Sequence, residues 1–240
     1  MRAVLWGANG AMGKLIAGIL GEETVGRVSI DGENGAAVSA AELGKVDADV
    51  VIDFSHHSAV ADVIAFAKEN RCAAVIGTTG HTEEEKALIY GAAKEIPVFY
   101  AGNMSLGIAV LCRLAKEAAA AFPDADIEIV EIHHNRKVDA PSGTAKMLFE
   151  AIHTVRPQAV ANCGRAGEGK RTKDEIGICA LRLGGVVGVH EVHIHTGNQS
   201  LTLRHEAIDR SMLAEGAVNA ARFTVGKPAG LYNMEDMLKR

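Results

Sequence analysis

The sequence is short of several features that would place it in a specialised class of protein. Its formal net charge is −5 over 240 residues, whereas a surface that binds nucleic acid or an anionic membrane needs an excess of basic residues. No apolar run approaches the roughly 20 residues that cross a bilayer, and the opening MRAVLWGANG lacks the pattern of a secretion signal. We therefore expect a cytoplasmic protein that binds neither nucleic acid nor membrane.

Cysteine and aromatic residues are also scarce. The four cysteines are scattered without a C-x-x-C pair, which predicts free thiols in a reducing compartment. They are Cys72, Cys112, Cys163 and Cys179. The abundance of alanine and glycine is typical of a globular protein, and 240 residues suffice for one large domain or two small ones.

The first half of the chain alternates short apolar runs with helical patterns. Strands are expected at 3–6, 26–31, 48–55 and 72–80, a fifth strand with its loop at 96–105, and helices at 12–20, 58–69 and 82–95. Strands that alternate with helices form right-handed βαβ units, whose parallel sheet is covered on both faces. This half therefore predicts an α/β fold.

The alternation of strands and helices ends after about residue 104. Helices are expected at 106–122, 142–152 and 210–222, and strands at 126–134, 175–183, 188–197 and 199–207, with the turn signal TGNQ between the last two strands. Because successive strands follow one another without helices, we expect an α+β domain with an antiparallel or mixed sheet.

The segment GANGAMG (7–13) lies between a predicted strand and a predicted helix. It is a variant of the dinucleotide-binding fingerprint, with Ala8 where the first glycine usually stands. Gly10 lets the backbone approach a pyrophosphate, Gly13 permits close packing of helix on sheet, and the helix N-terminus attracts the phosphates. The residues of this turn predicted to bind the cofactor are Gly7, Ala8, Asn9, Gly10, Ala11 and Met12.

Asp31 is expected at the end of the second strand, where a carboxylate accepts hydrogen bonds from the adenosine ribose. The next residue is Gly32 rather than a basic residue that would attract a 2′-phosphate. This favours NADH, with NADPH as the other cofactor to consider. The alternative interpretation of Asp31 is an ordinary turn residue.

Two further loops follow the fourth and fifth strands, in GTTG (77–80) and AGNMS (101–105). Ligands of open α/β sheets bind outside the carboxyl ends of the strands, so these loops are candidates to line the nicotinamide and its ribose. The residues concerned are Gly77, Thr78, Thr79, Ala101, Gly102, Asn103 and Met104. The alternative is that they are plain connecting loops.

The stretch EIHHNRKVDAPSGTA (131–145) collects the groups most suited to chemistry. His133 and His134 alternate across a strand end, so only one of them faces a given pocket squarely. Histidine is the usual general acid near neutral pH, and Lys137 suits a carboxylate. Ser142, Gly143 and Thr144 open a helix and form a second anion site. A small substrate with carboxylates is expected, and hydride transfer coupled to protonation if a nicotinamide lies opposite.

These segments, in order and over nearly the whole chain, resemble the 4-hydroxy-tetrahydrodipicolinate reductase (dihydrodipicolinate reductase) family of the diaminopimelate route to lysine. The match rests on GANGAMG, GTTG, AGNMSLG, the long H-H-x-x-K-x-D-A-P-S-G-T core and the closing GKPAGLYNMEDML. The resemblance implies NAD(P)H-dependent reduction of a cyclic dicarboxylate made from aspartate semialdehyde and pyruvate, giving tetrahydrodipicolinate and water.

The resemblance also implies roles for individual residues. His133 is expected to exchange the proton and Lys137 to be the second catalytic residue, while His134, Ser142, Gly143 and Thr144 contact the substrate. A Rossmann-type dinucleotide-binding domain is expected over 1–103 and 212–240. A substrate-binding and oligomerisation domain is expected over 104–211, through which four subunits form a homotetramer. No metal is expected.

Several alternatives stay open at this point. The enzyme could act instead on another small amino or hydroxy acid, or the protein could be a nucleotide-sensing regulator. His193 and His195 share a strand face, which suits a metal pair but is more typical of a packed or interface pair. The basic loop that holds Lys170 and Arg171 is either solvated or a lid over an anionic substrate.

Overall fold

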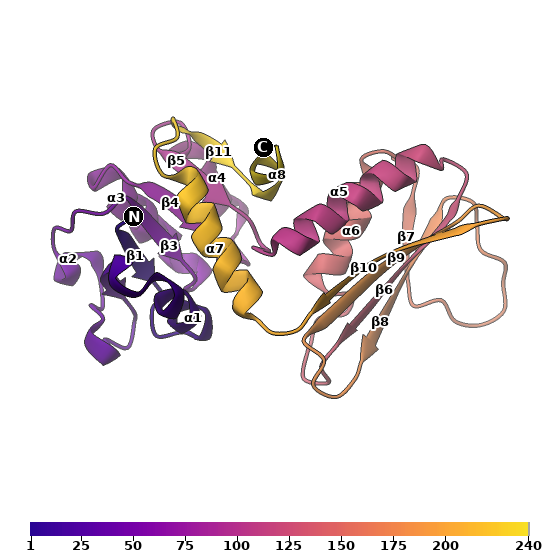
Figure 1. The fold of residues 1–240 in the computed structure, drawn as a ribbon, viewed down its shortest axis with the longest axis horizontal. Helices are drawn as coiled ribbons and strands as arrows, with labels where there is room; N and C mark the ends of the chain where they lie inside the picture. The colour runs from indigo at the N-terminus through magenta and orange to yellow at the C-terminus, as the bar shows by residue number, and fades with distance from the viewer. Residues whose placement is uncertain (240) are drawn as a thin grey trace. The chain divides into compact units, whose positions relative to one another are not determined.

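The computed structural model describes residues 1–239, which fold into two compact units (Figure 1). The first unit combines Met1–Ser105 with the C-terminal segment that begins at Ser211, and the second spans Leu106–Arg210. Within residues 1–239, no helix combines the length and the apolar composition of a membrane span.

The first unit is built on a six-stranded parallel sheet in the order β11-β5-β4-β3-β1-β2. Its strands are β1 (Ala3–Trp6), β2 (Thr24–Val28), β3 (Val50–Asp53), β4 (Ala73–Ile76), β5 (Pro97–Tyr100) and β11 (Gly230–Tyr232). Every residue of β1, β3 and β4 is buried, as expected for central strands of a sheet covered on both faces. The predicted Rossmann-type parallel sheet is confirmed.

Helices cover both faces of this sheet. They are α1 (Ala11–Leu20), α2 (Ala40–Leu43), α3 (Val60–Glu69), α4 (Glu83–Ala92), α7 (Ser211–Thr224) and α8 (Met234–Leu238). Helix α1 packs with α7 and α3 packs with α4. Trp6 and Phe66 meet edge to face with ring centroids 5.9 Å apart, which ties β1 to α3 in the core.

The second unit has a five-stranded sheet in the order β10-β9-β6-β8-β7. Its strands are β6 (Asp126–His133), β7 (Val160–Cys163), β8 (Glu175–Arg182), β9 (Gly188–His195) and β10 (Ser200–Ala207). Strand β8 runs parallel to β6 and β7, whereas β9 runs antiparallel to β6 and β10. The predicted mixed sheet is confirmed.

Helices α5 (Leu106–Ala121) and α6 (Gly143–His153) pack against one face of this sheet (Figure 1). Strand β6 alternates strictly, so that Ile127, Ile129, Glu131 and His133 are buried on the helix side. The inner face of β6 therefore ends in two polar residues, Glu131 and His133, after two isoleucines.

The second strand is the main departure from the expected elements. It ends at Val28 instead of residue 31, because the chain turns at Gly32, whose φ is +62°, into a short 3₁₀ turn. Asp31 therefore lies in the loop after β2. The short elements β7, β11, α2 and α8 were not anticipated from the sequence pattern.

Candidate active site

The GANGAMG turn has the close contacts that make glycine necessary. Gly7 has a φ of +81°, and a Cβ at this position would lie 2.3 Å from the carbonyl oxygen of Phe54. A Cβ on Gly13 would lie 2.3 Å from the Gly7 carbonyl oxygen. Gly10 precedes α1 with no side-chain cap, so the first N–H groups of the helix remain available to an anion.

Asp31 lies beside this turn. Its Oδ1 accepts hydrogen bonds from Asn9 Nδ2 and from the backbone N–H of Glu33, the latter at 3.2 Å. The hydrogen bond from Asn9 is the main cause that lowers the pKa of Asp31 below its usual value. The carboxylate is therefore charged at neutral pH and held next to the glycine turn.

The two other predicted loops lie at the carboxyl ends of neighbouring strands β4 and β5. A Cβ on Gly102 would lie 3.5 Å from the methyl group of Thr79, so the loops touch. Thr78 is buried and its Oγ1 accepts a hydrogen bond from Ser55 N at 2.9 Å.

Gly77 and Met104, in the same loops, are closely surrounded by other residues. A Cβ on Gly77 would lie 2.3 Å from the Phe54 ring. The side chain of Met104 is 1% exposed and lies in the core, so a contact of this residue with a cofactor, which stays a prediction, would come through its backbone. Asn103 Oδ1 accepts a hydrogen bond from Ser105 N at 2.8 Å.

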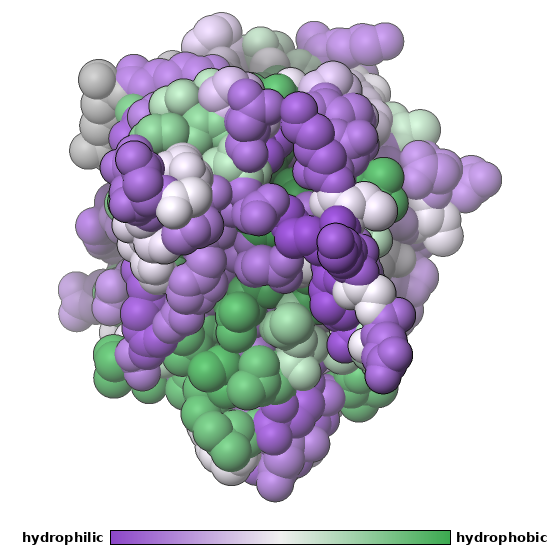
Figure 2. Space-filling model, turned by 90° about the vertical axis from the view of Figure 1, so that its right-hand side faces the viewer, coloured by the Kyte–Doolittle hydropathy of each residue, from purple (hydrophilic) through white to green (hydrophobic). Residues whose placement is uncertain are grey.

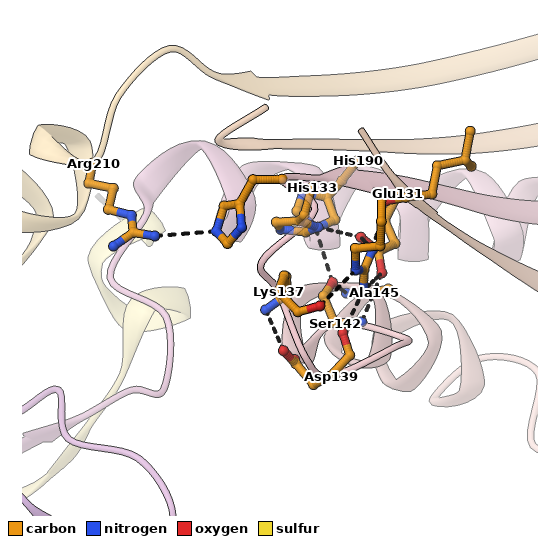
Figure 3. A network of polar contacts seen from close by, with 11 residues as sticks. Glu131, His133, Lys137, Asp139, Ser142, Ala145, His190 and Arg210 are labelled. Atoms are coloured by element: carbon orange, nitrogen blue, oxygen red, sulfur yellow. Dashed lines mark hydrogen bonds and ion pairs between the residues drawn. The ribbon is translucent and has the colours of Figure 1, made fainter. Parts of the chain in front are cut away.

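His133 is the last residue of β6 and is buried on the helix side of the sheet. Its Nδ1 forms a hydrogen bond with Glu131 Oε2 from two residues earlier on the same strand face (Figure 3). A histidine held by a carboxylate is the arrangement expected of a general acid–base group.

The Glu131 carboxylate is completely buried and multiply hydrogen-bonded. Arg182 at the end of β8 donates from Nη1 to Oε2 and from Nη2 to Oε1, each at 3.1 Å. Ser142 N donates to Oε1 at 3.1 Å. Burial raises the pKa of Glu131, but the hydrogen bonds from Arg182, His133 and Ser142 outweigh this and leave the pKa below its usual value.

His190 on β9 completes the buried cluster. Its ring meets that of His133 edge to face with centroids 5.1 Å apart, and its Nε2 is 3.3 Å from Ser142 Oγ. Burial lowers the pKa of His190 to about 4, assisted by the neighbouring His133. His190 is therefore neutral at physiological pH.

Glu131, His133 and His190 bring potential metal-ligand atoms within 4.8 Å of one another. However, both oxygens of Glu131 already accept hydrogen bonds from the Arg182 guanidinium. A cation bound there would displace these bonds and face a fixed positive charge. The cluster therefore suits proton chemistry better than metal binding.

The PSGT turn lies directly beneath this cluster. Ser142 caps α6 by accepting a hydrogen bond from Ala145 N at 3.2 Å, and its side chain is buried. Gly143 is exposed as the first residue of the helix. The backbone N–H of Gly143 faces the Asp139 carboxylate and helps to lower its pKa, so the N-terminus of α6 already attracts a negative charge, while the Ser142 hydroxyl supports the turn.

Lys137 and His134 lie on the more open side of the loop. Lys137 Nζ is paired with Asp139 Oδ1 at 2.7 Å, in a contact that is half exposed. Arg210 Nη2 donates to His134 Nε2 at 3.5 Å (Figure 3). Burial of the ring and the positive charges of Arg136 and Arg210 lower the pKa of His134. Its imidazole is therefore neutral at pH 7, with two arginine side chains nearby.

The second unit thus gathers its predicted site residues, His133, Lys137 and the 142–144 turn, around one strand end. Glu131, Arg182, His190 and Arg210 were not predicted. A signal for Glu131 was present, because a carboxylate two residues before a histidine on a strand shares its face. The partnership with Arg182 depends on the register of β6 with β8, which the local pattern does not contain.

The other candidate groups lie away from this cluster. Arg171 pairs with Asp126 at the first residue of β6, and the seven-residue rise to His133 corresponds to about 23 Å. The basic loop is therefore placed away from the strand end where a lid would be needed. His193 contacts Glu191 at 3.0 Å and His195 contacts Ser200 at 2.8 Å, so each has its own partner.

Two family models together match nearly the whole chain. The model for "Dihydrodipicolinate reductase, N-terminus" matches residues 1–104 and that for its C-terminus matches residues 107–238. The 4-hydroxy-tetrahydrodipicolinate reductase of Caldanaerobacter subterraneus subsp. tengcongensis is 42% identical, covering 100% of this chain and 99% of the relative. That of Alkaliphilus oremlandii is 41% identical, covering 99% and 98%.

Two solved structures are also similar to this chain, one in the same family and one in fold alone. The dipicolinate-bound dihydrodipicolinate reductase from Paenisporosarcina sp. TG-14 has a TM-score of 0.77 at 25% identity and covers 99% of both chains. Aspartate dehydrogenase from Thermotoga maritima, with a TM-score of 0.53 and 15% identity over 95% of this chain and 98% of that one, shares the fold alone. The alternative of another small-acid dehydrogenase is not favoured. Since relatives at about 40% identity match over full length, the protein is an oxidoreductase of the dihydrodipicolinate reductase family.

Proposed function

We propose that the protein reduces 4-hydroxy-tetrahydrodipicolinate to tetrahydrodipicolinate with NADH or NADPH, in the diaminopimelate route to lysine. The hydride replaces the ring hydroxyl, which leaves as water after it takes a proton. The observation that carries the proposal is the gathering of His133, Lys137 and the α6 N-terminus at one strand end. His133 supplies the proton in this scheme, and Lys137 assists as proton donor or carboxylate anchor.

The substrate carboxylates are proposed to bind around the loop that follows β6. Gly143 and Thr144 begin α6, and Lys137 offers a positive charge. A substrate carboxylate bound there would replace Asp139, which pairs with Lys137 and accepts a hydrogen bond from the Gly143 N–H. His134 contributes a neutral imidazole beside Arg210, and the buried Ser142 hydroxyl holds the turn in place. The solved relative with bound dipicolinate, also a dicarboxylate, supports this assignment.

The cofactor is proposed to bind across the carboxyl edge of the parallel sheet. The glycines of the 7–13 turn leave the backbone open to the close approach of a pyrophosphate, and Asp31, which lies beside this turn, is proposed to accept hydrogen bonds from ribose hydroxyls. The charged Asp31 would repel a 2′-phosphate, which supports NADH as the preferred cofactor. When bound, the nicotinamide supplies the hydride.

The open face of the second sheet supports the proposed homotetramer. Val130, Ile132, Cys179 and Leu181 lie on the face opposite α5 and α6, in register across β6 and β8. Figure 2 shows a group of hydrophobic residues in the lower part of a face that is elsewhere mostly hydrophilic. We also propose a cytoplasmic location, which suits the four free cysteines.

A coupled assay tests the reaction directly. The substrate is generated from pyruvate and aspartate semialdehyde by the preceding synthase, and oxidation of NADH or NADPH is followed by absorbance. We expect rapid turnover that depends on the synthase product. No turnover with this product, together with turnover on a simple amino or hydroxy acid, would overturn the proposal in favour of another dehydrogenase.

A further inference from the structure

We propose that Glu131 is a positioning residue that fixes the tautomer of His133, and that Arg182 and the Ser142 backbone N–H hold the carboxylate for this task. The inference rests on the proposed function, in which His133 supplies the proton. The buried Glu131–Arg182 pair then has a role behind this histidine, and one ring nitrogen of His133 exchanges the proton.

The first support is the geometry of the carboxylate. Glu131 and His133 lie on the same face of β6 because they are two residues apart. Oε2 faces His133 Nδ1 and Arg182 Nη1, while Oε1 faces Arg182 Nη2 and Ser142 N. Every partner other than the histidine is an obligate donor, so the carboxylate can only accept.

The second support is the fixed position of these donors. Arg182 also donates to the carbonyl oxygens of Leu181, at 2.8 Å, and of Asp139. Ser142 N is held at the cap of α6. The bidentate guanidinium holds Glu131 in one orientation and compensates its buried charge. A carboxylate held in this way requires a hydrogen on Nδ1 of His133.

The third support is the space around the other ring nitrogen. A Cβ on Gly188 would lie 3.1 Å from His133 Nε2, so the glycine at the start of β9 leaves this side of the ring uncrowded. The neighbouring His190 is neutral and packs by its ring edge. With Nδ1 committed to Glu131, Nε2 is the nitrogen that exchanges the proton with the substrate.

Glu131→Gln is the informative substitution, because it keeps the shape and removes the charge. With its oxygen in the place of Oε1, the amide accepts from Arg182 Nη2 and Ser142 N, whereas the reverse orientation would set its NH₂ group against both of these donors. The NH₂ group therefore faces His133 Nδ1, and the hydrogen bond from Arg182 Nη1 is lost. Nδ1 then accepts a hydrogen bond, and the neutral ring carries its hydrogen on Nε2 instead. The substitution thus reverses the tautomer without removing the histidine.

The test combines ¹⁵N-histidine NMR with steady-state kinetics on the full chain. The His133 signals are assigned by their loss in His133→Gln. In the wild type, we expect the hydrogen of the neutral ring on Nδ1, and in Glu131→Gln we expect it on Nε2. We expect kcat to fall at least about 10-fold in this variant with little change in KM for the dicarboxylate.

Two further variants separate positioning from general damage. Arg182→Lys retains a cation but cannot bridge both oxygens, so we expect a smaller loss of kcat and an unchanged tautomer. Glu117→Gln, at an exposed site on α5, is the matched control and should behave as the wild type. Circular dichroism checks that each variant is folded.

Three outcomes would overturn the inference: wild-type His133 with its hydrogen on Nε2, Glu131→Gln with an unchanged tautomer, or Glu131→Gln with wild-type kcat. If Glu131→Gln does not fold, the wild-type spectrum still decides the tautomer. Failure of the proposed function has a different signature, since the wild type would then not turn over the substrate while the tautomer remained measurable.

Discussion

His133 and His134 are adjacent in the chain but lie in different environments. His133 is buried against Glu131, while His134 lies in the loop beside Arg210. The alternation of side chains along a strand predicts this difference from the sequence alone. The identity of their partners could not be predicted, because Arg182 and Arg210 are brought to the strand end by register and by chain reversal.

Gly188 tests the role of the space beside His133. We expect Gly188→Ala to lower kcat, because its Cβ would lie 3.1 Å from Nε2 and crowd the nitrogen that meets the substrate. Steady-state kinetics measure the change. Gly185→Ala is the matched control, since a Cβ there meets nothing within 4 Å. Wild-type turnover in Gly188→Ala would show that Nε2 does not need this space.

Asp31 tests the proposed cofactor preference. Its pKa is lowered mainly by the hydrogen bond from Asn9, so a negative charge faces the ribose at neutral pH. We expect Asp31→Ser to raise KM for NADH and to lower KM for NADPH, because the ribose acceptor weakens and the repulsion of a 2′-phosphate disappears. An unchanged ratio of the two KM values would mean that Asp31 is only a turn residue.

At the scale of secondary-structure elements, the long periodic segments are predictable and the short ones are not. The strict alternation of β6 and the apolar runs of β1, β3 and β4 are visible in the sequence. In contrast, β7 has exposed residues at three of four positions and β11 has only three residues. Both are edge strands, which the sheet specifies through backbone pairing instead of side-chain pattern.

His190 on β9 is buried against Ser142, the cap of α6. Because its ring is neutral in the folded protein, the free energy of unfolding should depend on pH. Burial lowers the pKa of His190 to about 4, whereas an unfolded histidine titrates near 6.5. Below that value the unfolded chain binds the proton first, so stability falls as the pH drops from about 6.5 towards 4. The full effect of this one group is about 3 kcal/mol.

Chemical unfolding at pH 7 and pH 5 measures this dependence. We expect His190→Gln to be less stable than the wild type at pH 7 and to lose part of the pH dependence. His195→Gln, at the exposed end of the same strand, is the control and should retain it. An identical pH dependence in His190→Gln and wild type would contradict the buried neutral state of His190.

At the scale of the whole molecule, the open face of the second sheet should control assembly. We expect Leu181→Glu to dissociate the proposed tetramer, because it places a charge on the apolar face shared with Ile132. Sedimentation velocity measures the assembly. Leu114→Glu on α5, where the leucine is similarly exposed, is the matched control. If Leu181→Glu remains a tetramer, the subunit interface does not lie on this face of the sheet.

The proposed reaction depends on different roles for the two histidines and Lys137. The decisive measurement is steady-state reduction of the synthase product by His133→Ala, His134→Ala and Lys137→Ala variants that retain the wild-type fold. We expect His133→Ala to lose kcat by at least about 100-fold, Lys137→Ala to lose kcat and raise KM, and His134→Ala mainly to raise KM. Full turnover by His133→Ala or Lys137→Ala would contradict the proposed site.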